Sequence, residues 1–255
     1  MMKYKGGPHK TENDILRFGF YVSLTTAAVT VITFAIALLT PPLSGPFCRG
    51  DCLEYPYADI LARFPRDYYW MYPTMLISVL FVLLMVTIQQ YADSGKKLYG
   101  QIGLSIALIA SAILIPNYFV QVSVIPPSLV NGETDGIALI SQFNPHGIFI
   151  ALEEIGFLLM SFSLFMIIPV FDAGSGIKRA MRITWSAGFI LILIAFILIS
   201  VKYGIMREYI FEVAVISIVW LELIVSSVLL SIHFRRAWKK NIRMMQKQTY
   251  QNHIP

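Results

Sequence analysis

A histidine and two adjacent carboxylates lie in the otherwise apolar stretch from Gln142 to Gly156. An acidic side chain at the centre of a spanning helix costs roughly 2.5 to 3.5 kcal/mol on insertion scales, so ionisable groups in such a segment indicate function. Glu153 follows His146 by seven residues, nearly two helical turns, and the two therefore share a face. Buried carboxylates can exchange protons in catalysis or transport. His146, Glu153 and Glu154 are therefore the candidate catalytic residues.

Further polar and aromatic residues are expected near the same depth. Asn117 and Gln121 are four residues apart and so lie on one face of a helix, where they could orient a substrate. Tryptophan rings could stabilise a cationic intermediate. The candidate ligand-binding residues are Asn117, Gln121, Gln142, Asn144, Trp185, Glu212, Trp220 and Glu222.

Structural explanations stand beside these functional ones. Asn117 and Gln121 could instead bond to neighbouring helices, an interaction worth about 0.6 kcal/mol on average. His146 could be an interfacial residue beside a helix cap, and Arg207 a solvated residue at the membrane boundary. Glu212 could pair with Lys202, and Glu222 could be a protonated acid bonded to a carbonyl.

The elements that carry these residues follow from composition. The chain is 56% hydrophobic and 14% charged, and its mean hydropathy is +0.66. Soluble domains contain roughly 45–50% apolar residues and about 25% charged residues. Its apolar blocks reach the roughly 20 residues that a helix needs to cross a bilayer, whereas barrel strands would be short and alternating. The sequence therefore predicts an all-α, polytopic integral membrane protein with a bundle of six transmembrane helices.

We expect one transmembrane domain, residues 18–234, between an N-terminal tail at 1–17 and a basic tail at 235–255. The first apolar block is too long for the core of a signal peptide, so it is interpreted as a retained span. Asn144 as N-cap and Pro145 as first helical residue are predicted to begin the fourth span. The spans are expected at about 18–40, 70–90, 100–125, 145–171, 183–201 and 209–234, with a long outer loop at 41–69.

The distribution of basic residues predicts the topology. A cytoplasmic N-terminus followed by six spans places 15 of the 20 Lys and Arg residues on the inner side, which favours cytoplasmic termini and a multi-pass protein of the plasma membrane. Cys48 and Cys52 then face the oxidising side, where a disulfide is allowed but not required. The charged residues flank the apolar blocks, where basic side chains meet anionic lipid headgroups. This explains the net charge of +5 without a nucleic-acid partner.

The sequence contains no phosphate-binding loop, no His-Glu-x-x-His and no CxxCH motif, and predicts neither a cofactor nor a metal site. Three functions remain. The first is a protein that binds a lipid or isoprenoid in an outward-facing polar pocket. If this protein is an enzyme, it isomerises or cyclises the bound molecule. In general layout such a bundle is similar to small membrane sterol isomerases and terpene cyclases, a likeness of architecture that transfers no residue assignment. The others are a proton-linked transporter or channel and a non-enzymatic ligand-binding or assembly protein.

Overall fold

The computed structural model describes residues 8–172, 174 and 176–251. It is all-helical, with 83% helix and no strands in that part of the chain. Six of its helices are long and apolar enough to cross a membrane. This confirms the predicted fold class, while the side of the membrane on which the termini lie stays a prediction.

Long helices carry the spans, and shorter helical turns form the connections. The long helices are α1 (Pro8–Leu39), α2 (Met71–Tyr91), α3 (Lys97–Ser123), α6 (Ile148–Met166), α7 (Gly176–Tyr203) and α8 (Glu208–Gln251). The short elements are η1 (Gly45–Phe47), η2 (Ala58–Arg63), η3 (Arg66–Tyr68), η4 (Ser94–Lys96), α4 (Ile125–Val130), α5 (Ile137–Ile140), η5 (Ile168–Val170) and η6 (Gly204–Met206).

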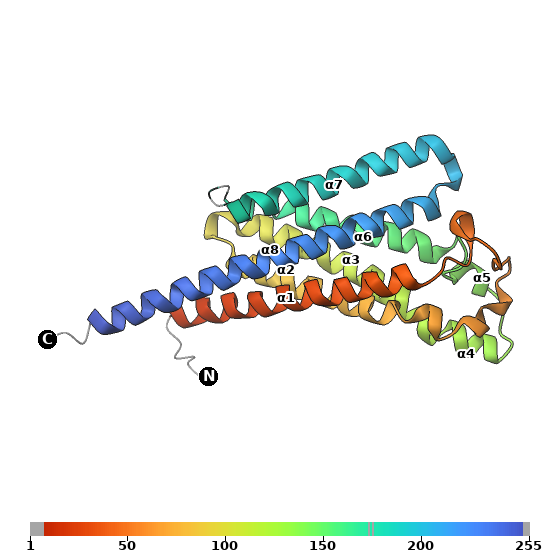
Figure 1. The fold of residues 1–255 in the computed structure, drawn as a ribbon, viewed down its shortest axis with the longest axis horizontal. Helices are drawn as coiled ribbons and strands as arrows, with labels where there is room; N and C mark the ends of the chain where they lie inside the picture. The colour runs from red at the N-terminus through yellow and green to blue at the C-terminus, as the bar shows by residue number, and fades with distance from the viewer. Residues whose placement is uncertain (1–7, 173, 175, 252–255) are drawn as a thin grey trace.

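The two ends of the bundle differ (Figure 1). The loop end carries the α1–α2 connection, α4 and α5, and the tail end carries both chain termini. α1 and α8 lie side by side and run beyond the other helices toward the tail end. Near that end the Asn13 amide donates a hydrogen bond to the Met245 sulfur at 2.8 Å. The predicted basic tail thus continues α8 as helix through Gln251.

Small and hydroxyl-bearing residues form the face of α1 that packs into the bundle. Gly19 is so close to Phe234 of α8 that a Cβ would lie 2.9 Å from its ring. Ser23, Thr26 and Thr30 are buried, and each hydroxyl donates to the carbonyl four residues earlier. Small side chains with internally satisfied hydroxyls let helices approach closely within a membrane, which explains the long contact between α1 and α8.

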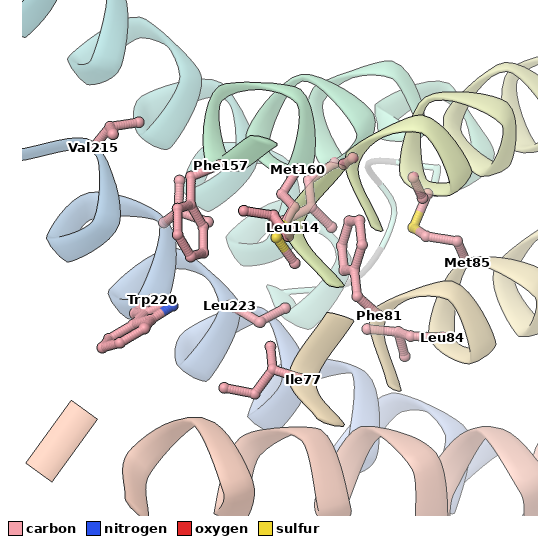
Figure 2. Close-up of a cluster of buried hydrophobic side chains, with 14 of the residues drawn as sticks. Ile77, Phe81, Leu84, Met85, Leu114, Phe157, Met160, Val215, Trp220 and Leu223 are labelled. Atoms are coloured by element: carbon pink, nitrogen blue, oxygen red, sulfur yellow. The ribbon is translucent and has the colours of Figure 1, made fainter. Parts of the chain in front are cut away.

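Large apolar side chains fill the centre of the bundle (Figure 2). Phe81 of α2, Leu114 of α3, Phe157 of α6 and Leu223 of α8 are fully buried and pack together. A Cβ on Gly156 would lie 2.5 Å from Leu114, so the helices α3 and α6 meet where only glycine fits. This core fixes α3, α6 and α8 relative to one another, and these three helices carry the polar residues of interest.

The fourth span begins later than the sequence predicted. α6 starts at Ile148 with Gly147 as N-cap, and not at Asn144 and Pro145. The Asn144 side chain instead closes a local turn, accepting from the His146 amide at 3.0 Å and donating to the Ala138 carbonyl at 2.8 Å. An asparagine before proline suits such a turn as well as a cap, and here the turn prevails.

Cys48 and Cys52 are joined in a disulfide, with their Cα atoms 5.9 Å apart. The bond closes a short ring in the connection between α1 and α2. The next segment of that connection forms η2, which buries Ile60 in the hydrophobic core.

Candidate functional site

Three helices contribute to a buried polar cluster near the loop end. The Tyr118 hydroxyl of α3 donates a hydrogen bond to Oε1 of Glu153 on α6. The carboxyl groups of Glu153 and Glu212, the latter on α8, lie close enough to interact electrostatically. Their residues are 0% and 7% exposed, and apart from the other carboxyl group Oε2 of each has no hydrogen-bond partner among the described residues. The cluster therefore holds two acids side by side with unused acceptor capacity.

Glu154 has a different partner from its neighbour Glu153. Its Oε2 accepts a hydrogen bond from Nη1 of Arg207 at 3.0 Å in an ion pair. The Arg207 guanidinium also lies over the rings of Phe196 and Phe211, at 4.7 and 5.6 Å from their centroids. Arg207 is thus bound into the junction of α6, α7 and α8, where the sequence had favoured a solvated residue.

His146 lies apart from the acids of α6. It precedes the helix, is half exposed, and its Nδ1 is 3.4 Å from Oε2 of Glu208 at the start of α8. Because α6 begins only at Ile148, the expected shared helical face of His146 and Glu153 does not form. The structure thus pairs His146 with Glu208 and gives it no contact with the carboxyl pair.

Asn117 and Gln121 hold backbone groups at the entry to α6. The Asn117 amide donates to the Phe149 carbonyl at 3.0 Å. The Gln121 amide donates to the Ile140 carbonyl at 2.7 Å and accepts from the Gln142 amide at 2.9 Å. Both side chains are buried and bonded in this way, so they position the segment that leads to Glu153.

An open cavity of about 230 Å³ lies at the loop end between α1, α8 and the connections. Its walls are mostly apolar and aromatic, and Glu212 is its buried acid on α8. The side chains that line it from α1 and its end are Phe34, Ala37, Leu38, Thr40, Pro41, Pro42, Leu43 and Ser44. The others are Asp67, Trp70, Gln142, Phe143, Phe149, Tyr209, Glu212, Val213, Ile216, Ser217 and Trp220.

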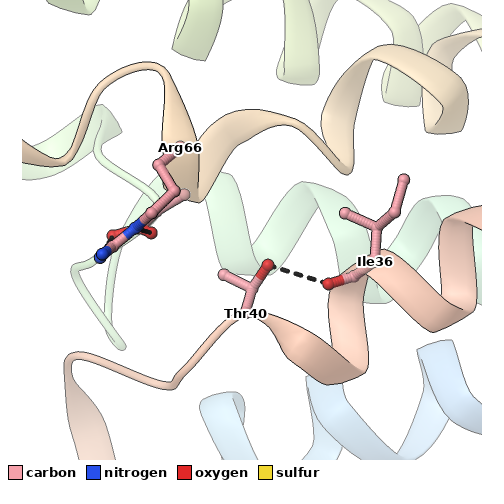
Figure 3. A network of polar contacts seen from close by, with 4 residues as sticks. Ile36, Thr40 and Arg66 are labelled. Atoms are coloured by element: carbon pink, nitrogen blue, oxygen red, sulfur yellow. Dashed lines mark hydrogen bonds and ion pairs between the residues drawn. The ribbon is translucent and has the colours of Figure 1, made fainter.

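The end of α1 shapes one rim of this cavity. The Thr40 hydroxyl donates to the Ile36 carbonyl at 3.0 Å and closes the last turn of the helix (Figure 3). Asp67 is buried, and both its oxygens accept from the guanidinium of Arg66, at 2.6 and 3.1 Å. Gly45 adopts φ +65°, a conformation that suits glycine, and rests against the ring of Tyr209. These contacts hold the connection over the cavity.

The cavity includes only some of the residues predicted to bind a ligand. Three of the candidate ligand-binding residues, Glu212, Gln142 and Trp220, line it. The remaining candidates lie outside its lining, namely Asn117, Gln121, Asn144, His146, Glu153, Glu154, Trp185 and Glu222.

Two of these residues belong to the middle of the bundle. Nε1 of Trp185 donates to the Ser226 hydroxyl at 2.8 Å, which satisfies the indole in the core. Glu222 is buried against Gly188, where a Cβ would lie 2.4 Å from its carboxyl carbon. Its carboxyl group lies within reach of the Ser161 hydroxyl of α6. Glu222 is thus a buried acid that belongs neither to the carboxyl pair nor to the cavity.

No group of three or more His, Cys, Asp or Glu residues in the described part of the chain could hold a metal ion. No family model, curated protein or solved structure matches the chain. The chemistry of the site therefore has to be argued from its own residues.

Three residues of the site were not predicted as such from the sequence. Tyr118 follows Asn117 directly, and a tyrosine deep in an apolar block is the signal that it needs a polar partner. Trp70 and Asp67 were not among the candidate residues. Their sequence gives no sign that the connection folds back to make them cavity walls.

Proposed function

We propose that the protein binds a lipid-like, amphipathic molecule in the cavity at its loop end. The observation that carries this proposal is the combination of apolar walls with a buried acid, Glu212, that forms no salt bridge among the described residues. Ligand sites are typically apolar cavities with a few polar groups that fix orientation. Glu212 supplies that polar contact here.

The size and the rim of the cavity support an amphipathic ligand. Its volume of about 230 Å³ falls just below the roughly 300–1,000 Å³ of typical ligand pockets. The polar end of a ligand fits such a space, while its chain must extend beyond it. Leu38 and Val213 line the rim and are 73% and 39% exposed, so an apolar chain leaving between α1 and α8 would continue over apolar surface.

Acid–base conversion of the bound molecule is the second candidate function. Glu212 is the acid of the carboxyl pair that lines the cavity, and its neighbour Glu153 accepts a hydrogen bond from Tyr118. A carboxyl group within reach of a ligand and backed by a second acid can give up or accept a proton. Glu212 thereby takes the central place that the sequence had given to Glu153, Glu154 and His146.

Native mass spectrometry of the purified full chain tests the binding proposal. We expect a bound adduct of lipid size on the wild-type protein, and its loss in Ile216→Trp, which places an indole in the cavity. Leu221→Trp is the matched control, because Leu221 is exposed on the same helix and does not line the cavity. An adduct that survives Ile216→Trp, or a wild-type protein that carries none and takes up none when dodecanol is added, contradicts the proposal.

A further inference from the structure

The acids around the cavity differ in whether a cation balances them. Asp67 is paired with Arg66 at 2.6 Å, and Glu154 with Arg207 at 3.0 Å. Glu208, at the start of α8, has His146 at 3.4 Å. Each of these acids thus has a basic side chain within ion-pair distance.

Glu212 and Glu153 have no such partner. Within the described residues neither forms a salt bridge, and the two carboxyl groups lie within hydrogen-bonding reach of each other. Two such groups can share one proton, which leaves one negative charge on the pair, and a buried charge is costly unless a partner balances it. A cation that reaches Glu212 from the cavity would balance that charge.

The walls around Glu212 suit a cation as well. Six aromatic rings line the cavity, from Phe34, Trp70, Phe143, Phe149, Tyr209 and Trp220. The indoles of Trp70 and Trp220 are 6.3 Å apart between ring centroids, at an angle of 65°. Aromatic faces attract an ammonium group, tryptophan most strongly, and the attraction grows when the cation is desolvated.

The side chains that line the cavity do not suit an anionic ligand. Its described side chains include two acids, Asp67 and Glu212, and no Lys, Arg or His. Fatty-acid carboxylates and phosphate headgroups are bound by basic groups or free backbone amides. A neutral alcohol could bond to Glu212 but would leave the charge of the acid pair unbalanced.

We propose that the ligand of this cavity is a lipophilic amine, whose ammonium group is held by Glu212 and the surrounding aromatic rings. The inference rests on the proposed function, because it assigns a ligand class to the same cavity. The ammonium group takes the place of the missing cation, and the apolar chain leaves past Leu38 and Val213.

A titration with three probes of equal chain length tests the inference. Dodecylamine, dodecanol and dodecanoic acid are added separately to the full chain at pH 7.5, and the bound fraction is measured by native mass spectrometry. We expect the amine to bind at least about tenfold more tightly than the alcohol, and the acid most weakly. Glu212→Gln should remove the preference for the amine, so that the variant binds the amine and the alcohol with similar affinity.

Glu208→Gln is the matched control, since Glu208 lies on the same helix, is already paired with His146 and does not line the cavity. It should keep the preference. Equal binding of amine and alcohol by the wild-type protein overturns the inference, even if Glu212→Gln does not fold. In that case, loss of dodecanol binding in Ile216→Trp still supports the proposed lipid-like ligand. Failure of all three probes to bind overturns both.

Discussion

Arg207 and Glu154, 53 residues apart in the chain, form an ion pair of 3.0 Å that joins the start of α8 to α6. Glu154 is largely buried, and its Oε1 has no partner among the described residues. The pair is therefore the principal charge contact between these helices near the loop end. Glu153, the residue before Glu154 on α6, interacts with Glu212 instead.

Substitution of Arg207 and substitution of Glu154 should destabilise the protein by different amounts. Arg207→Met leaves Glu154 buried without a cation and should destabilise the protein by about 1–3 kcal/mol. Glu154→Gln keeps an acceptor for Arg207 and should cost less. In the double variant the loss should be smaller than the sum of the two single losses, because the variants share one interaction. Unfolding by SDS in mixed micelles measures these differences, and additive losses would contradict the pairing.

Tyr118→Phe removes the hydroxyl that donates to Glu153. The carboxyl group then loses its hydrogen-bond donor inside the bundle, and we expect a loss of about 1–2 kcal/mol in unfolding free energy. The same deletion in Tyr99→Phe is the control, because Tyr99 is 39% exposed. Equal effects of the two substitutions in the same SDS titration would show that the bond to Glu153 contributes nothing.

The topology predicted from the basic residues can be tested at the disulfide. After mild reduction of intact cells, Cys48 and Cys52 should react with a membrane-impermeant maleimide, because they are predicted to face outward. In a Cys48→Ser, Cys52→Ser background, Lys97→Cys should react only once the cells are permeabilised. The reverse labelling pattern would place the termini outside.

The ion pair between Lys96 and Asp172 at the tail end should respond to pH. Lys96 holds the pKa of Asp172 below its ordinary value of 3.8, with smaller effects of Lys178 and Arg182. A lowered pKa means that the contribution to stability is present above pH 3.8 and is lost as the pH falls through the lower, folded-state pKa. The melting temperature of the wild type should therefore exceed that of Asp172→Asn at neutral pH by a small amount, since the pair is exposed.

Below the folded-state pKa of Asp172, the wild type and Asp172→Asn should have the same melting temperature. Asp135→Asn, in the connection between α4 and α5, is the control for the loss of an exposed carboxylate, because Asp135 forms no described salt bridge. A gap between wild type and Asp172→Asn that persists unchanged at low pH would rule out an origin in the ion pair.

The sequence predicted the six-helix fold class, because length and apolarity alone decide it. It predicted less about the site, since its decisive contacts join residues from different helices. Tyr118 with Glu153 and Arg207 with Glu154 are 35 and 53 residues apart, and no local pattern encodes either pair. Glu212 was among the predicted ligand contacts, but its exposure to the cavity depends on how the connection after α1 folds back.

α8 is one continuous helix that is longer than the hydrocarbon core of a membrane is thick. Its 44 residues extend about 66 Å at 1.5 Å per residue, roughly twice the 30 Å thickness of the hydrocarbon core. The helix begins beside the cavity and carries the basic residues Arg235 to Arg243 beyond the other helices. Because the helix is continuous, a tilt of its projecting end would also move Glu212.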